Sequence, residues 1–314
     1  SIVRKYRSKI QVAIIYMDTN GISFNRPNNP LYKAISYGDV EVARWLLKAG
    51  ADPNYLALNS SPLYVSNALC SAIQAKTNAI ELVKLLLEHG AHPDLPHSME
   101  LSTSLHIACR QGRREILKML LGVPNVNVNV RNTYEQTPIY EVSDENSYKI
   151  LVASEKVNFN VRDDYAQTPL IHFIEREQYH IVMALTLDKN VDVNARDICT
   201  EQTSLQMLVA RHFSTRNRRY EKDDIYTCIR NLLHRKDIQP NLVYGNTSYT
   251  PWEMITQRPG NEELVKLFIE YGHPNEPPVL HEYTPLWNAK KQRVLEDRGM
   301  SEDVAMKTMS YLNE

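Results

Sequence analysis

The hydrophobic positions of the chain fall into short blocks that recur along its length. One kind of block carries paired leucines, then a glycine, then turn-forming residues: WLLKAGADPN ends at Asn54 and LLLEHGAHPD ends at Asp94. The apolar pair indicates a helix, and Gly50 or Gly90 after it is typical of a helix end. Asn, Asp and Pro then favour a turn that runs into a hairpin. These blocks predict helices that each lead into a loop.

A second kind of block combines Thr or Asn, often a Pro, and an apolar anchor. Thr can cap a free backbone N–H at a helix start, and Pro is tolerated at the first helical position. The gaps between anchors are 38, 36, 34, 31, 35, 47 and 34 residues. Most lie near a repeat period of ~33 residues. The anchors are Leu31, Leu69, Leu105, Ile139, Leu170, Leu205, Trp252 and Leu286.

Two of the connecting loops are near copies of each other. Residues 127–140 read NVNVRNTYEQTPIY, and residues 158–171 read NFNVRDDYAQTPLI, 31 residues further on. One helical hairpin cannot bury its own apolar face, so neighbouring units must cover it. Small residues three positions after an anchor, such as Ala72 and Ala108, would let adjacent helices approach closely. The copied phrase is therefore predicted to be the part through which one unit docks onto the next.

These paired blocks resemble the ankyrin-repeat family over residues 21–286. The combination of Thr-Pro-Leu starts with LLxxGADPN ends carries the resemblance. It implies an all-α fold, an ankyrin-repeat α-solenoid of about seven helix-turn-helix units with short β-hairpin loops and helical end caps. The irregular units are similar to those of fungal ankyrin proteins and of bacterial secreted effectors.

We expect one continuous domain. Residues 1–27 would form an N-terminal capping partial repeat, because end units need polar outer faces. Ankyrin repeats would occupy residues 28–278, with an insertion at about 210–224. Residues 279–314 would form a C-terminal partial repeat and capping helices.

Composition excludes little beyond the repeats themselves. With 43% hydrophobic and 23% charged residues, the chain reads as globular. A net charge of -1 gives no specific nucleic-acid signal. The absence of ~18 consecutive apolar residues argues against a membrane span. We expect an intracellular, cytoplasmic monomer, or a bacterial effector delivered into a host cell. The cysteines are predicted to be reduced and mostly buried: Cys70, Cys109, Cys199 and Cys228.

The resemblance implies recognition of a protein or peptide. In ankyrin-like proteins the hairpins and inner helices line a concave groove where partners bind. Tyrosine provides rigid contact area with a polar tip, and tyrosines cluster at the predicted hairpin tips, although they could instead pack on the next hairpin as structure. The partner-binding candidates are Tyr134, Tyr165, Tyr249, Tyr283, Arg110, Glu175, Arg176 and Arg258.

Two units depart from the pattern. The insertion in the sixth unit is either a basic loop for an acidic partner or phosphate, or an extended helix or solvated insertion without a ligand. In the fourth unit Val142 replaces the small residue, and residues 143–146 form either an acidic feature or a polar turn. The basic residues of the insertion are Arg211, Arg216, Arg218, Arg219 and Lys222.

We assign no catalytic residue, metal ligand or cofactor. The chain lacks HExxH, GxSxG and a phosphate-binding loop. His89, His92 and His97 invite a metal interpretation, but the first two flank the glycine turn of a repeat. His106 occupies a position where family members often carry His for backbone hydrogen bonding. Two alternatives stay open: a passive scaffold that joins two partners, and an enzyme whose groove would hold Tyr140, Asp144, Glu145, His172 and Glu253.

Overall fold

The computed structural model describes residues 29–58, 65–198, 200–213, 219–240, 249–256 and 261–271. Both predicted end caps lie outside these residues, as do Tyr283, Arg258 and Cys199. The chain divides into two compact units, residues 1–169 and 170–314. Within the described residues, no helix is long and apolar enough to cross a membrane.

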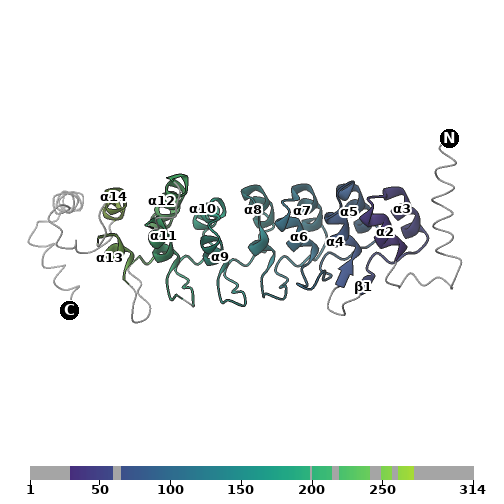
Figure 1. Ribbon diagram of the computed structural model, residues 1–314, viewed down its shortest axis with the longest axis horizontal. Coiled ribbons are helices and arrows are strands. Elements are labelled where there is room, and N and C mark those ends of the chain that lie inside the picture. The colour runs from purple at the N-terminus through teal and green to yellow at the C-terminus, as the bar shows by residue number, and fades with distance from the viewer. Residues whose placement is uncertain are drawn as a thin grey trace, which may run out of the picture. The chain divides into compact units, whose positions relative to one another are not determined.

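The first unit is built from pairs of antiparallel helical segments in two rows (Figure 1). Its first row packs in the order α2, α4, α6 and η1, and its second row in the order α3, α5, α7 and α8. The pairs are α2 (Pro30–Ser36) with α3 (Val40–Lys48), α4 (Ala68–Ile73) with α5 (Ala79–Glu88), α6 (Ser104–Arg110) with α7 (Arg114–Leu121), and the 3-10 helix η1 (Pro138–Glu141) with α8 (Glu145–Val152).

The second unit repeats this arrangement. In it α11 packs on α12 and α13, while α12 packs on α10 and α14. Its pairs are α9 (Pro169–Glu175) with α10 (Tyr179–Leu187), α11 (Ser204–His212) with α12 (Arg219–Leu233), and α13 (Pro251–Thr256) with α14 (Glu262–Glu270). The predicted all-α fold of stacked ankyrin-like units is thus confirmed.

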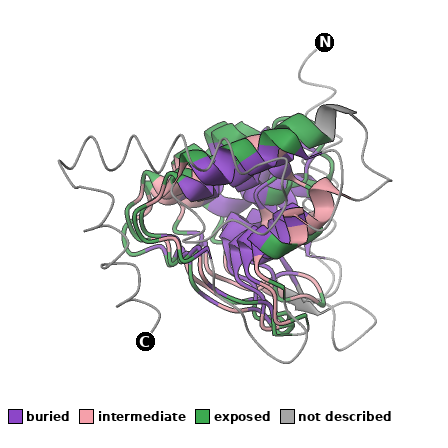
Figure 2. Cartoon of the chain, turned by 90° about the vertical axis from the view of Figure 1, so that its left-hand side faces the viewer, coloured by how far each residue is buried: buried purple, intermediate pink, exposed green. Residues whose placement is uncertain are grey.

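The anchors predicted from the sequence form the core. Every anchor within the described residues is at most 6% exposed. The predicted small positions Ala34, Ala72 and Ala108 are likewise buried. Buried residues line the inner sides of the helices, whereas the outer surface of the second row and the loop ends are exposed (Figure 2). Gly38 has φ +69°, and a Cβ there would lie 2.2 Å from Thr77 Oγ1, so this helix end requires glycine.

The fourth helical pair differs from the expected pattern. Its first segment is only the single turn η1, because Val142 adopts an extended conformation directly after it. Asp144 then caps α8, accepting hydrogen bonds from the backbone N–H groups of Asn146 (3.0 Å) and Ser147 (3.1 Å). Asp144 therefore has the helix-capping role expected of a polar turn.

The loops are held by turns more than by strands. β1 (Leu56–Leu58) pairs antiparallel with β2 (Val65–Asn67). Later loops in the described residues are closed by isolated bridges, His97 with Ser102 and Arg196 with Thr203. The hairpin geometry expected from the resemblance is therefore reduced to short turns in most units.

The copied Asn-x-Asn phrase closes one of these turns. Asn127 Oδ1 accepts the backbone N–H of Asn129 (2.9 Å), and Asn158 Oδ1 accepts that of Asn160 (3.0 Å). Asp52 does the same for Asn54 (2.8 Å). The first polar residue of the phrase thus folds the loop back on itself.

The second Asn of the phrase links one repeat to the next. Asn129 Oδ1 accepts the N–H of Asn158, and its Nδ2 donates to the Lys156 carbonyl, both at 2.8 Å. Asn54 makes the same pair of bonds to His92 N–H (2.7 Å) and the Gly90 carbonyl (2.9 Å). We call this pair of bonds between one loop and the next a rung of a ladder along the repeats. An amide can form both bonds because its oxygen accepts while its nitrogen donates.

Asp94 occupies a rung position but cannot donate. Its carboxylate accepts the N–H of Asn127 at 3.1 and 3.3 Å. By the register of the other rungs, the carbonyl that an amide would reach here is that of Asn125. This rung therefore carries half of the hydrogen bonding of its counterparts.

We predict that Asp94→Asn raises the free energy of unfolding by about 0.5–1 kcal/mol, because it supplies the missing donor. The reciprocal change Asn129→Asp should lower the free energy of unfolding by a similar amount. Urea denaturation at high salt, which screens the change in charge, measures both. Shifts of the same sign in the two variants would refute the ladder interpretation.

Candidate partner-binding surface

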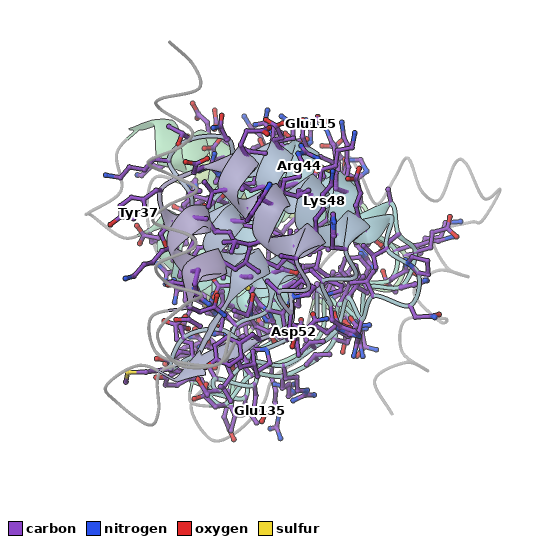
Figure 3. The ribbon with its side chains drawn as sticks, turned by 90° about the vertical axis from the view of Figure 1, so that its right-hand side faces the viewer. Tyr37, Arg44, Lys48, Asp52, Glu115 and Glu135 are labelled. Atoms are coloured by element: carbon purple, nitrogen blue, oxygen red, sulfur yellow. The ribbon has the colours of Figure 1, made fainter. Side chains whose placement is uncertain are left out.

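Successive loop ends of the first unit expose apolar side chains. Met99 and Leu101 are 59% and 40% exposed, Tyr134 is 44% exposed and Tyr165 is 63% exposed. These four residues are called the tip row here. Figure 3 shows Glu135, the neighbour of Tyr134, at a loop end far from the second helices. Soluble proteins seldom expose contiguous apolar side chains without a binding role.

Backbone hydrogen bonds join the loop ends that carry the tip row. The N–H of Thr133 donates to the Glu100 carbonyl (2.8 Å), and the N–H of Asp164 donates to the Tyr134 carbonyl (3.0 Å). Adjacent loop ends that carry the tip row are therefore in direct contact.

Buried polar side chains fix the backbone under each tyrosine. Asn132 Oδ1 accepts the N–H groups of Tyr134 (2.9 Å) and Gln136 (3.1 Å). Asp163 Oδ1 accepts those of Tyr165 (3.1 Å) and Gln167 (3.0 Å).

Asn132 and Asp163 are only 4% and 5% exposed, so water competes little for these bonds. The second oxygen of Asp163 also accepts Gln136 Nε2 (3.0 Å), which ties the Tyr134 and Tyr165 turns together. Both tyrosines thus project from a preformed backbone.

A charge cluster borders the tip row on the first helices. Arg110 donates to Glu141 at 2.6 and 2.9 Å and to Glu100 at 2.9 Å. The hydrogen bond to Glu141 is the main cause that raises the pKa of Arg110. Arg110, a predicted contact, is thus already engaged in holding the Glu100 loop over η1. Its side chain is still 41% exposed and accessible to a partner.

The predicted partner contacts described in the second unit are exposed, and the backbone carbonyls of two of them accept hydrogen bonds within that unit. Glu175 and Arg176 lie exposed at the end of α9, and the Glu175 carbonyl accepts from Arg211 (3.2 Å). Tyr249 is 57% exposed, and its carbonyl accepts Gln206 Nε2 (2.8 Å).

Sequence reasoning missed three exposed apolar loop residues. They are Met99, Leu101 and Ile198, the last of which is 54% exposed. They lie in loops equivalent to those of Tyr134 and Tyr165, so aligning the loops rather than looking for tyrosine would have identified them.

The basic insertion is partly helical. Arg211 lies in α11 and pairs with Glu177 (2.7 Å), and α12 begins at Arg219 and runs for 15 residues against 9 for α10. Lys222 is exposed on α12. Arg216, Arg218 and the side chain of Arg219 lie outside the described residues. The described part of the insertion thus lengthens the second helix of this pair.

The histidines considered as metal ligands each have a ring nitrogen within hydrogen-bond distance of a backbone group. His89 Nδ1 lies 2.9 Å from the Leu85 carbonyl, and His92 Nδ1 accepts the Asp94 N–H (3.2 Å). His97 Nδ1 accepts the Asn67 N–H (3.2 Å). Within the described ranges, no three His, Cys, Asp or Glu side chains converge as a metal site would need.

Two of the residues named for the enzyme alternative form hydrogen bonds to backbone groups. The Tyr140 hydroxyl lies 2.5 Å from the Val161 carbonyl oxygen and 2.8 Å from that of Gln167, and its single proton is shared between these two acceptors. Glu253 accepts the backbone N–H of Thr250 (2.7 Å) at the start of α13. A surface hollow of about 330 Å³ lies where α5 meets α7, lined by Ile80 and by residues 112–116. None of the residues named for the enzyme alternative is among those lining residues.

We predict that Asp163→Ala lowers the free energy of unfolding by about 2–4 kcal/mol, because it leaves several buried donors without an acceptor. Thermal and urea denaturation would measure this. The matched control Asp164→Ala removes an exposed neighbouring carboxylate, and its effect should stay within about 0.5 kcal/mol. Equal effects in both variants would show that Asp163 does not hold the Tyr165 turn.

Comparisons with known proteins agree with this architecture. The chain is 27% identical over 150 residues to the E3 ubiquitin-protein ligase KEG of Arabidopsis thaliana, covering 45% of the chain and 9% of the ligase. It is 30% identical over 123 residues to cyclin-dependent kinase inhibitor 2A of Monodelphis domestica, covering 39% of the chain and 66% of the inhibitor. The chain thus spans less than two thirds of either relative.

The fold is similar to the crystal structure of the ankyrin repeat domain of Bcl-3, a member of the IkappaB protein family. The TM-score is 0.56 at 20% identity, with 73% of this chain and 94% of that one covered. A family model described as ankyrin repeats (3 copies) matches residues 55–132 and 105–197, and the single ankyrin repeat matches residues 28–57. These matches span more than half of the 314 residues. The chain therefore belongs to the ankyrin-repeat family, whose repeats are protein-interaction modules.

Proposed function

We propose that the chain recognises a protein or peptide partner through the tip row of the first unit and the first helical segments beside it, α6 and η1. The observation that carries the proposal is the tip row itself, four exposed apolar side chains on loop ends joined by backbone hydrogen bonds. Such a surface gains free energy when a partner removes it from water.

The rigid backbone beneath the tyrosines favours affinity. A partner need not order the turns that Asn132 and Asp163 already hold, so less entropy is lost on binding. Each tyrosine ring ends in a polar hydroxyl, so the side chain can face water before binding and pack against a partner afterwards. Tyrosines in this setting are frequent energetic centres of interfaces.

The charge cluster would set the orientation of the partner. Arg110 is shared between Glu100 and Glu141, so a partner group that approaches either carboxylate competes with an existing ion pair. Exposed ion pairs of this kind contribute little to stability. Their exchange can therefore discriminate between partners at small cost to the fold.

Protein recognition is also consistent with the relatives. One of the similar proteins bears the name of a kinase inhibitor, which is a protein that acts on another protein. The similarity covers only part of each relative, so the identity of the partner has to come from this chain's own surface.

We predict that the double variant Tyr134→Ser/Tyr165→Ser weakens partner binding by at least about 30-fold, near 2 kcal/mol, while the melting temperature stays within about 1–2 °C. Affinity purification with mass spectrometry would identify partners of the wild-type chain, and calorimetry would compare their affinities.

The control is Tyr37→Ser. Tyr37 is 81% exposed but lies at the end of α2, away from the loop ends (Figure 3). Its removal should leave the affinity unchanged. A double variant that captures the same partners with the same affinity as the wild-type chain would refute the proposed surface.

A further inference from the structure

A side chain from each of three first helices reaches the following repeat. His106 Nε2 lies 2.9 Å from the Gln136 carbonyl, and the Tyr140 hydroxyl donates to the Gln167 carbonyl at 2.8 Å. Gln206 Nε2 donates to the Tyr249 carbonyl, also at 2.8 Å. Each acceptor directly precedes the Thr that begins the next unit. Three chemically different side chains thus make the same contact with the next repeat, which is called the joint here.

In His106 and Gln206 the other end of the same side chain caps its own helix. His106 Nδ1 accepts the backbone N–H of Thr103 (3.1 Å), as Gln206 Oε1 accepts that of Thr203 (2.8 Å). A backbone amide can only donate, so Nδ1 of His106 must carry no proton. The ring is fixed as the neutral tautomer that donates from Nε2.

A second histidine is constrained in the same way on the other side of this repeat. His97 Nδ1 accepts the backbone N–H of Asn67 (3.2 Å), and Asn67 begins α4 of the preceding repeat. The backbone N–H of His97 donates to the Ser102 carbonyl (2.9 Å), and this bond closes the loop that carries Met99 and Leu101. His97 is 2% exposed, so the ring has no ready access to water.

We propose that His97 and His106 make the repeat of α6 and α7 an acid-sensitive segment of the first unit. Protonation of His97 Nδ1 turns an acceptor into a donor that faces the Asn67 N–H across the boundary with the preceding repeat. Protonation of His106 Nδ1 does the same to the Thr103 N–H at the start of α6, where the Thr103 hydroxyl, 2.9 Å away, can still accept, while Nε2 continues to donate to the Gln136 carbonyl.

The joints made by Tyr140 and Gln206 contain no group that protonates in mild acid. Acidification therefore loosens the boundary with the preceding repeat and the start of α6, together with the apolar loop end between residues 97 and 102.

The surroundings of both rings support this. Burial lowers the pKa of His97 from 6.5 to about 4. Burial also lowers the pKa of His106, although the Gln136 carbonyl, Glu141 and Glu100 oppose the shift and Arg110 adds to it. In both cases the neutral ring belongs to the folded state.

The direction of the pH dependence follows from these lowered pKa values. The unfolded chain takes up protons on these rings near pH 6.5, whereas the folded chain holds His97 neutral down to about pH 4. The unfolded state thus binds more protons in this window, so stability is complete above it and is lost as the pH falls through it. His97 alone should raise the ratio of unfolded to folded chain about 30-fold between pH 7.5 and pH 5.

The chain supplies its own replacements for the test. His106→Gln copies the residue that makes both bonds in α11, and His97→Asn copies Asn132, which occupies the equivalent loop position. Urea denaturation at pH 7.5 and 5.0 would be compared for the wild type, both single variants and the control His180→Gln, whose ring is exposed on α10. We expect each of the two variants to lose its share of the pH dependence and the control to retain it.

Retention of the full wild-type pH dependence in both variants would overturn the proposal. If a variant does not fold, an NMR titration of the wild-type imidazoles decides. Values of pKa below about 5.5 for both rings would support the proposal, and a value at or above the ordinary value of about 6.5 for either ring would overturn it. Amide exchange at Asn67 and Thr103 would locate the opening, because their protection should fall in acid before that of Thr203.

Discussion

The structure depends on the burial of one helical pair's apolar face by the next pair. Helices as short as α4, with six residues, and α6, with seven, are far below the length at which isolated helices persist in water. They form because anchors such as Leu69 and Leu105 are withdrawn from water by their neighbours on both sides. The loops, the tip row and the histidine joints exist only once this stacking is in place.

Hydrophobic burial is not directional, so it does not by itself define how one repeat sits against the next. Hydrogen bonds from buried or half-buried side chains supply that register. The Asn129 side chain forms hydrogen bonds to the backbone of the following loop. His106 and its equivalents Tyr140 and Gln206 contact the backbone of the following repeat from the first helices. A shifted register would leave these polar groups without partners, which costs more than the bonds contribute when they are made.

The sequence was sufficient for features whose cause is local. Anchor spacing, the glycines at positions 50 and 90 and the exposed tyrosines near loop ends follow from short patterns. The Arg110 cluster and the Asn rungs did not, because each joins residues about 30 positions apart across a boundary that only the stacked structure defines. The left-handed conformation of Glu135, with φ 57°, is equally hidden, since the buried Asn132 imposes it through the turn.

The separation of fixed backbone from free side chains explains how such a repeat can diverge and still fold. At the joint, His, Tyr and Gln reach the equivalent carbonyl in three different repeats. The position therefore accommodates different side chains that can donate a hydrogen bond at this distance. At the loop ends, Asn132 and Asp163 hold the turns while the rings of Tyr134 and Tyr165 make little of the fold. Substitution at the tips is therefore free to follow a partner. Histidine at position 106, where tyrosine or glutamine serves in other repeats, and histidine at position 97, where Asn132 stands in a later loop, provide the proposed sensitivity to protons.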